Sequence, residues 1–158
     1  MQTRRDDGYE IDTAPGRLNV KLVHSWLATD AYWALGRPED VMVRAVRNSL
    51  CFGLYAPDGQ LVGFARSVTD LATFAWLCDV YIAPEARGRG LGTWLADRAT
   101  QHLVGHGLRR VVLATRDAHG VYQKAGYAPI SRPERWMEIW RGNDRPDEVL
   151  AAGDVAHT

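Results

Sequence analysis

A short run of glycines and arginines, Arg87-Gly88-Arg89-Gly90-Leu91-Gly92, separates two contrasting stretches of the chain. Residues 77–82, just before it, are apolar and β-favouring, which predicts a strand that Pro84 ends. After it, apolar residues recur at every fourth position and predict one helix face: Leu91, Leu95, Ala99 and Leu103. A turn that opens a helix presents unpaired N–H groups and the positive end of the helix dipole. With two arginines beside it, this turn is suited to bind a phosphate or pyrophosphate.

Three interpretations of this turn compete. A Walker-type loop carries Lys before a Ser or Thr after its last glycine, and here Thr93 follows Gly92 directly. A dinucleotide-binding loop has the spacing G-x-G-x-x-G, whereas the glycines here alternate. In the third interpretation, the alternating glycines follow an arginine and a strand that ends in Pro-Glu. This pattern resembles the coenzyme A loop of the GNAT acetyltransferase superfamily. Residues 79–92 match the central motif of that family almost position by position.

A second segment, residues 117–127, resembles the later motif of the same family. In that motif a short helix carries a tyrosine, here Tyr122, and ends in a glycine followed by an aromatic residue, here Gly126 and Tyr127. The interval between the motifs fits one helix, one turn and one strand. An ordinary strand-turn-helix with glycines for packing is the simpler alternative, but it leaves the second motif unexplained. The resemblance covers residues 18–141.

The resemblance implies a set of binding residues for acetyl-CoA as cosubstrate. The pantetheine arm of the donor would lie along the strand before the loop, as an added strand would, on Val80, Tyr81 and Ile82. A backbone N–H there would polarise the thioester carbonyl. The pyrophosphate would fall on Arg87, Gly88, Arg89, Gly90, Leu91 and Gly92, with Thr93 close by.

Tyr122 aligns with the family's tyrosine that protonates the leaving thiolate. A phenol with a pKa near about 10 is a reasonable acid for a thiolate of similar basicity. The alternative is that Tyr122 is a core aromatic on the buried face of a short helix. The two motifs together favour the catalytic role.

The general base is not defined by the sequence. Some family members carry a glutamate four residues before the position of Val80, where this chain has Trp76. Asp79 is the nearest acid, but strand alternation points it opposite Val80. Further candidates, each more often a surface or capping residue, are Asp70, His24 and His119. Asp117 is most simply the N-cap of the short helix, and a neutral amine or a water relay are the alternatives to a dedicated base.

The acceptor pocket is expected from the least family-like parts of the chain. These are the aromatic residues Trp26, Tyr32 and Trp33 and the loop 69–74, whose aromatics could cage an amine cation. Trp26 and Trp33 are also seven residues apart, which would place them on one helix face as core residues. That spacing favours the core interpretation for both tryptophans.

Composition describes a single globular domain and excludes several classes of protein. Of 158 residues, 46% are hydrophobic and 24% are charged. Lys+Arg and Asp+Glu both number 19, and this balance argues against nucleic-acid binding. There is no apolar run of about 18 residues for a membrane span and no apolar core for a secretory signal, so we expect a cytoplasmic protein. Cys51 and Cys78 are expected as free thiols, with a disulfide as the alternative, and no Cys/His cluster predicts a metal site.

The predicted fold is α/β (α+β), with a mixed, mostly antiparallel central sheet and helices on both faces. Strands are expected at 18–24, 50–55, 60–68, 74–82, 110–115, 127–130 and 135–140. Helices are expected at 26–35, 39–48, 90–104 and 118–124. Residues 1–17 are expected to form a flexible arm, 18–141 the GNAT domain and 142–158 a mobile tail.

The expected function is transfer of an acetyl group from acetyl-CoA to a primary amine by direct attack. The acceptor would be a small molecule or a peptide amine, and a homodimer is compatible with the sequence. One alternative is a non-catalytic module that senses acyl-CoA, although Tyr122 favours an enzyme. Another is a transferase that uses a different acyl-CoA donor, because the loop reads only the coenzyme A end. A structural protein would leave the two motifs unexplained.

Overall fold

The computed structural model of this chain describes residues 1–141. Its elements follow in the order β1 (Gln2–Arg4), β2 (Glu10–Asp12), α1 (Val20–Asp30), α2 (Glu39–Arg47), β3 (Leu50–Tyr55), β4 (Leu61–Thr69), β5 (Ala75–Ile82), α3 (Leu91–Gly105), β6 (Val111–Val112) and α4 (His119–Lys124). Short 3-10 turns lie at Pro15–Arg17, Pro84–Ala86 and Pro133–Arg135. Two compact units are present, one formed by Met1–Tyr127 and one that begins at Ala128. No helix within residues 1–141 is long and apolar enough to cross a membrane.

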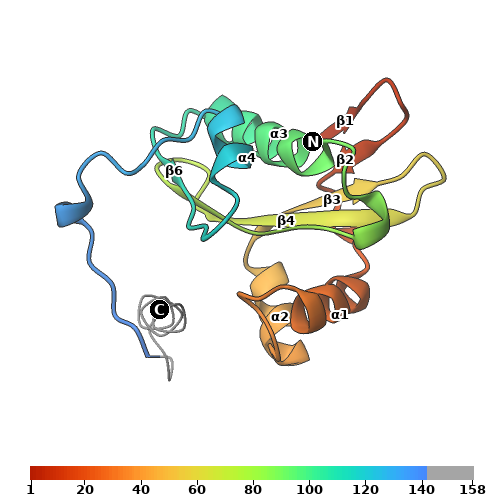
Figure 1. Cartoon of the computed structure of the whole chain (residues 1–158), viewed down its shortest axis with the longest axis horizontal. Helices are drawn as coiled ribbons and strands as arrows, with labels where there is room; N and C mark the ends of the chain where they lie inside the picture. The colour runs from red at the N-terminus through yellow and green to blue at the C-terminus, as the bar shows by residue number, and fades with distance from the viewer. Residues whose placement is uncertain (142–158) are drawn as a thin grey trace, which may run out of the picture. The chain divides into compact units, whose positions relative to one another are not determined.

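In the first unit, β1 to β6 form one sheet in which the strands lie in chain order. Neighbouring strands are antiparallel except β5 and β6, which pair in parallel with Ala75 opposite Val111. Helices α3 and α4 lie on one face of the sheet and α1 and α2 on the other (Figure 1). This arrangement confirms the predicted fold class.

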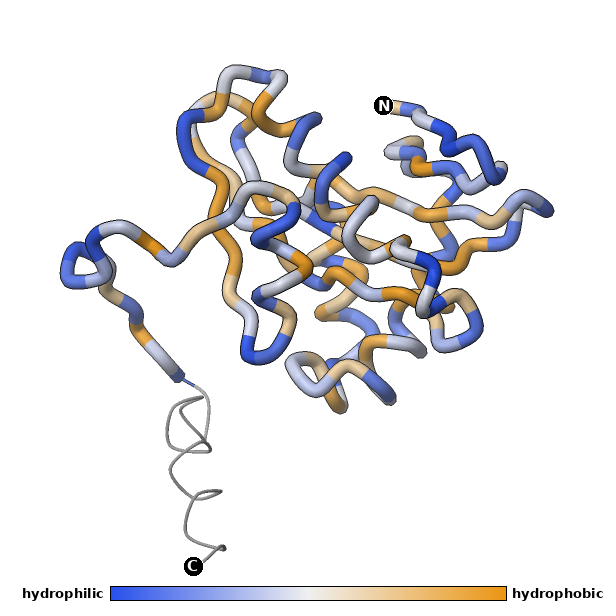
Figure 2. Tube along the Cα trace, turned by 45° about the horizontal axis from the view of Figure 1, so that its top comes forward, coloured by the Kyte–Doolittle hydropathy of each residue, from blue (hydrophilic) through white to orange (hydrophobic). Residues whose placement is uncertain are grey.

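The sheet is buried on both faces because each face has its own apolar core. Phe52 and Leu54 of β3 pack with Leu95 of α3 in one cluster, whereas Phe64 of β4 packs with Leu27 of α1 in the other. Figure 2 shows the apolar stretches in the central strands and polar residues in the connecting loops. Side chains alternate along a strand, so the central strands of a sheet buried on both faces must be apolar at nearly every position.

The N-terminal residues correct the prediction of a flexible arm at 1–17. Strands β1 and β2 form a hairpin that extends the sheet, with Arg4 opposite Glu10 and Glu10 opposite Tyr55 of β3. The polar composition of the segment was misleading because two of its carboxylates, Glu10 and Asp12, are buried in ion pairs with Arg17. Those pairs allow a polar strand to lie inside a folded sheet.

Residues 18–24 do not form the predicted strand, because helix α1 begins within them, at Val20. The side chain of Asn19 accepts a hydrogen bond of 3.1 Å from the backbone N–H of Leu22 and so caps the helix. The predicted helix at 26–35 accordingly begins earlier, at Val20, and ends at Asp30. The short apolar alternation predicted a strand because it takes no account of Asn19 as a helix-capping residue.

The C-terminal strands predicted at 127–130 and 135–140 are not formed. In residues 128–141 the one regular element is the 3-10 turn Pro133–Arg135. Pro129 and Pro133 each lack the N–H that a ladder requires, which removes donors from this segment. The predicted strand at 110–115 is likewise reduced to Val111–Val112. The predicted tail, 142–158, lies outside the described residues.

Candidate functional site

Strand β5 carries a bulge at Asp79. Its pairing with β4 steps from Cys78 to Tyr81, so Asp79 and Val80 lie opposite a single residue of β4. Asp79 has a left-handed backbone with a φ of 51°, which aspartate tolerates better than most residues. As a result, Val80 packs toward α3 and Tyr81 toward α1. A bulge of this kind interrupts the ladder and redirects side chains, often beside a functional site.

The glycine-rich loop presents open backbone donors at the start of α3. Gly88 and Gly90 have φ angles of 76° and 71°, and an added Cβ would meet no atom of residues 1–141 within 4 Å at either position. Conformation, rather than crowding, therefore requires glycine at these positions. The first helical hydrogen bond runs from the N–H of Trp94 to the carbonyl of Gly90. The N–H groups of residues 91–93 make no hydrogen bond within residues 1–141, and they lie at the positive end of a 15-residue helix.

The residues of this loop differ in how accessible they are. Arg87, Gly88, Arg89 and Gly90 are exposed, and Gly92 and Thr93 are half-buried in the first helical turn. Leu91 is buried in the core below the loop. The exposed face of the predicted phosphate site therefore consists of backbone and of the two arginines.

Arg87 does not extend freely over the loop. Its Nη2 lies 2.6 Å from Oδ2 of Asp30, and its Nε donates to the carbonyl of Ile82 at 2.9 Å. Tyr81 donates its hydroxyl to the same Asp30 oxygen at 2.7 Å. Burial, together with this hydrogen bond to a carboxylate, raises the pKa of Tyr81 to about 12. The side chain of Tyr81 thus points toward α1. Of the three residues predicted to bind the pantetheine arm, Tyr81 therefore has only its backbone available on the opposite face of the sheet.

Arg5 is a cation near the loop that the sequence analysis missed. It lies after β1, donates from Nη1 to the carbonyl of Arg89 at 3.2 Å and stands 5.5 Å from the ring centre of Trp94. Asp7 holds the guanidinium through Nε and Nη2. The sequence signal for this approach was the Asp7-Gly8 turn, because Gly8 has a φ of 90° and reverses the chain into β2.

A cavity of about 640 Å³ opens beside the bulge. β5 and β6 pair only at Ala75 and Trp76, and both Val80 of β5 and Thr115 after β6 line the cavity. The cavity also receives residues of β4, of the segment after α1 and of α4. Two parallel strands that part in this way leave unpaired edges on which an extended ligand could add.

Tyr122 lines this cavity. Its ring packs edge-on against Tyr127, whose hydroxyl lies 2.9 Å from Oγ1 of Thr100 on α3, so Tyr127 fixes the end of α4. Within residues 1–141 the Tyr122 hydroxyl makes no hydrogen bond, and its oxygen is not fully buried. Burial of the ring raises the pKa of Tyr122 to about 12, so the hydroxyl stays protonated and able to donate at neutral pH.

Asp79 sits in the floor of the cavity and is saturated with donors. Its carboxylate accepts from Arg37 at 2.7 Å and 3.3 Å, from Nε of Arg66 at 2.6 Å and from Nε1 of Trp33 at 3.1 Å. Burial opposes ionisation of Asp79, but the hydrogen bonds from Arg37 and the charge of Arg66 outweigh it and hold the pKa below the usual range. An ionised carboxylate with this many donors is a poor proton acceptor.

Two of the other predicted bases, Asp70 and His24, have local partners as well, whereas His119 is exposed at the start of α4. Asp70 accepts from the side chain and N–H of Thr73, which lowers its pKa well below the usual range. Nε2 of His24 lies 2.8 Å from the carbonyl of Arg37. Asp117 is not the N-cap that the sequence predicted: that position is Ala118, whose N–H donates to Oγ1 of Thr115 at 3.1 Å. Asp117 is exposed and lines the cavity, which makes it the most accessible carboxylate there.

The two tryptophans near α1 have different roles. Trp26 stacks on Tyr81 with ring centres 5.5 Å apart and belongs to the core, as predicted. Trp33 lies beyond the end of α1, is 43% exposed and lines the cavity, so the core interpretation is wrong for it. Tyr32 and Trp76 also line the cavity.

Both cysteines are free, and burial raises the pKa of each thiol to about 11.

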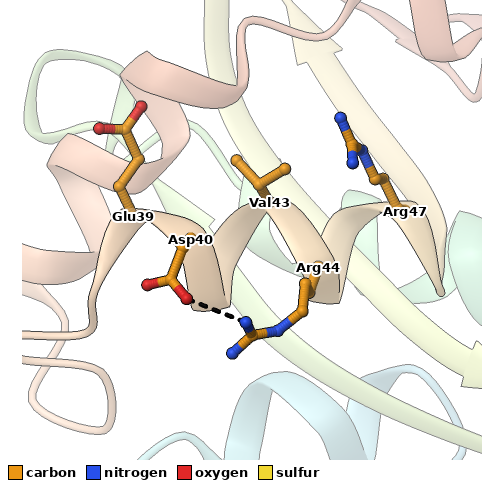
Figure 3. A pocket seen from close by; sticks show the side chains of 5 residues that line it. All are labelled: Glu39, Asp40, Val43, Arg44 and Arg47. Carbon is orange, nitrogen blue, oxygen red and sulfur yellow. Dashed lines mark hydrogen bonds and ion pairs between the residues drawn. The ribbon is translucent and has the colours of Figure 1, made fainter.

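A second hollow, of about 570 Å³, lies over α2 and is lined by Glu39, Asp40, Val43, Arg44 and Arg47 (Figure 3). Its charged side chains are exposed, and Arg44 pairs with Asp40 one helical turn away at 2.9 Å. Such a pair is typical of a solvated helix face. None of the predicted site residues lines this hollow, so the candidate site is the cavity beside β5 together with the adjoining loop.

Comparison with known proteins agrees with this geometry. The acetyltransferase (GNAT) family model matches residues 20–127, which include the bulge, the loop and Tyr122. The chain belongs to the GNAT acetyltransferase family. A Gibberella zeae protein that carries an acetyltransferase name is 36% identical over 142 residues, which cover 77% of this chain and 78% of that protein.

Solved structures of the GNAT family share this fold. A GNAT-family protein of Xanthomonas campestris pv. campestris is 42% identical, with a TM-score of 0.78 over 84% of this chain and 93% of that one. Glucosamine-6-phosphate N-acetyltransferase of Arabidopsis thaliana superposes with a TM-score of 0.59 over 86% of this chain and 99% of its own, at 14% identity. At that identity the likeness concerns the fold alone.

Proposed function

We propose that this GNAT-family protein is an N-acetyltransferase that moves an acetyl group from acetyl-CoA to a primary amine. The observation that carries the proposal is the open start of α3, where the N–H groups of residues 91–93, unpaired within residues 1–141, follow two glycines with positive φ. That arrangement suits a pyrophosphate. The cavity beside Val80 adjoins it and holds Tyr122, which supports a reaction rather than binding alone.

The proposed reaction uses the chain's residues in three places. The loop residues Arg87 to Gly92 hold the pyrophosphate, and the backbone of residues 80–82 pairs with the pantetheine arm. The amine nitrogen attacks the thioester carbonyl carbon, and the C–S bond breaks as the tetrahedral intermediate collapses. Tyr122 gives its proton to the leaving thiolate and is reprotonated by solvent, while the proton of the attacking amine passes to water or to Asp117.

Two experiments test this proposal in sequence. Calorimetry with acetyl-CoA should show binding, and desulfo-CoA should bind with similar affinity because phosphate contacts dominate. A panel of primary amines is then followed by release of free thiol from acetyl-CoA. Failure to bind acetyl-CoA contradicts the proposal. Binding with no thiol release from any amine supports a non-catalytic sensing module instead.

A further inference from the structure

The floor of the cavity contains two guanidinium groups for one carboxylate. Arg37 and Arg66 both pair with Asp79, and the three side chains are 19%, 14% and 2% exposed. Arg37 follows α1, Arg66 lies on β4 and Asp79 on the bulge of β5, so three separate segments converge here. Such a cluster is expensive to bury unless its charges are balanced.

The charges of this cluster are not balanced by its own residues. Among the described residues, Asp79 is the carboxylate whose charge acts on Arg66, and the neighbouring thiols Cys51 and Cys78 are kept neutral at pH 7 by burial, which raises their pKa. Asp117 also lines the cavity, but it is exposed and lies 3.8 Å from Arg116. Among the described residues, the floor therefore carries one more cation than carboxylate.

Donors remain available on both arginines. The hydrogen bonds of Arg66 use Nε toward Asp79 and Nη1 toward Oγ of Ser49, and those of Arg37 use Nη1 and Nη2. Within residues 1–141, Nη2 of Arg66 and Nε of Arg37 make no hydrogen bond, and neither nitrogen is fully buried. Both arginines line the cavity, and guanidinium N–H groups are strong donors to a planar carboxylate.

We infer that the acceptor of the proposed acetyl transfer carries a carboxylate, which seats against Arg37 and Arg66 in the cavity floor. The aromatic wall of Tyr32, Trp33 and Trp76 contacts an apolar body between the carboxylate and the amine. The amine then lies toward Tyr122 and Val80, on the donor side of the same cavity. The substrate class is an amino carboxylic acid with an apolar or aromatic body. This inference rests on the proposed function.

Matched pairs of acceptors test the inference with the wild-type protein. Phenylalanine, tryptophan, leucine and 6-aminohexanoate are each compared with the neutral primary carboxamide of the same compound, and kcat/KM is measured by thiol release. We expect at least one acid to exceed its carboxamide by about tenfold or more, because only the carboxylate balances the arginines. With acetyl-CoA bound and other amines of the panel turned over, equal rates, a preference for carboxamides or no turnover of any acid overturns the inference. Failure to bind acetyl-CoA, or binding with no thiol release from any amine, instead removes the proposed function itself.

A variant then assigns the preference to the cluster. Arg66→Gln should bring the acid-to-carboxamide ratio close to one, mainly through KM of the acid, and leave acetyl-CoA affinity unchanged. Arg44→Gln is the matched control, since it removes the same charge from the exposed face of α2 and should not alter the ratio. If Arg66→Gln is not folded by circular dichroism, Arg37→Gln takes its place. An unchanged ratio in a folded variant of either arginine overturns the assignment.

Discussion

Nη2 of Arg87 lies 2.6 Å from Oδ2 of Asp30, so the first arginine of the glycine-rich loop is paired with α1 rather than free above the start of α3. Both side chains are about half exposed, at 50% and 47%. An exposed pair of this kind is weak and can be exchanged for a ligand phosphate. In the proposed complex, the pair therefore competes with the donor for the charge of Arg87.

Asp30→Asn should tighten acetyl-CoA binding, because it frees the charge of Arg87 while an amide oxygen can still accept from Tyr81. We expect a change of roughly threefold at low salt, which fades as salt rises. Calorimetry at two salt concentrations measures it. Asp40→Asn, which frees Arg44 on α2, is the control and should have no effect. Weaker binding by Asp30→Asn would mean that Asp30 positions Arg87 for the phosphate.

Gly90→Asp should weaken acetyl-CoA binding at least tenfold, about 1.4 kcal/mol. The substitution places a negative side chain where we propose that the backbone meets the pyrophosphate. It also strains a residue whose φ is 71°, so a control must carry the same strain. Gly107→Asp meets that need, because Gly107 has a φ of 86° with open space around it and follows the other end of α3. Equal affinity of the two variants would remove the loop from the binding site.

The loop and its flanking elements could be predicted from the sequence because their signals are local. Glycines with positive φ, a proline after a strand and apolar residues at helical spacing act within a few residues of one another. The same holds for the hairpin of β3 and β4, where Gly59 has a φ of 86° in the predicted turn. The cavity's aromatic wall was foreseen only in part, because the end of α1 at Asp30 separates Trp33 from Trp26.

The charged floor of the cavity could not be predicted, because its members are distant in the sequence. Arg37 and Arg66 lie 42 and 13 residues from Asp79. Their meeting depends on the bulge and on the path of the chain after α1, which no local pattern encodes. The hairpin of β1 and β2 was missed for a related reason, since Glu10 is polar in sequence and is buried only through pairing with Arg17.

Glu10 should make stability depend on pH in the acid range. Hydrogen bonds from Arg17 and then Arg4 lower the pKa of Glu10 from 4.5 to about 2. Because the folded pKa is the lower one, this contribution is complete above pH 4.5 and is lost as pH falls toward 2. Glu10→Gln should therefore lower the urea midpoint at pH 7 and flatten its decline between these limits. Glu85→Gln, at an exposed position, is the control, and a parallel decline in Glu10→Gln would contradict the assignment.

Tyr122→Phe should preserve binding and lose rate. The Tyr122 hydroxyl makes no hydrogen bond within residues 1–141, so its removal leaves the packing against Tyr127 intact and the fold should survive. If the hydroxyl protonates the leaving thiolate, kcat should fall on the order of 10²-fold, with little change in KM for acetyl-CoA. Tyr127→Phe is the control, since it removes a hydroxyl bonded to Thr100 and should lower stability while kcat is largely retained. Full kcat in Tyr122→Phe would mean that solvent protonates the thiolate and that Tyr122 only packs. The assay uses whichever amine acceptor gives the highest thiol release in the wild-type panel.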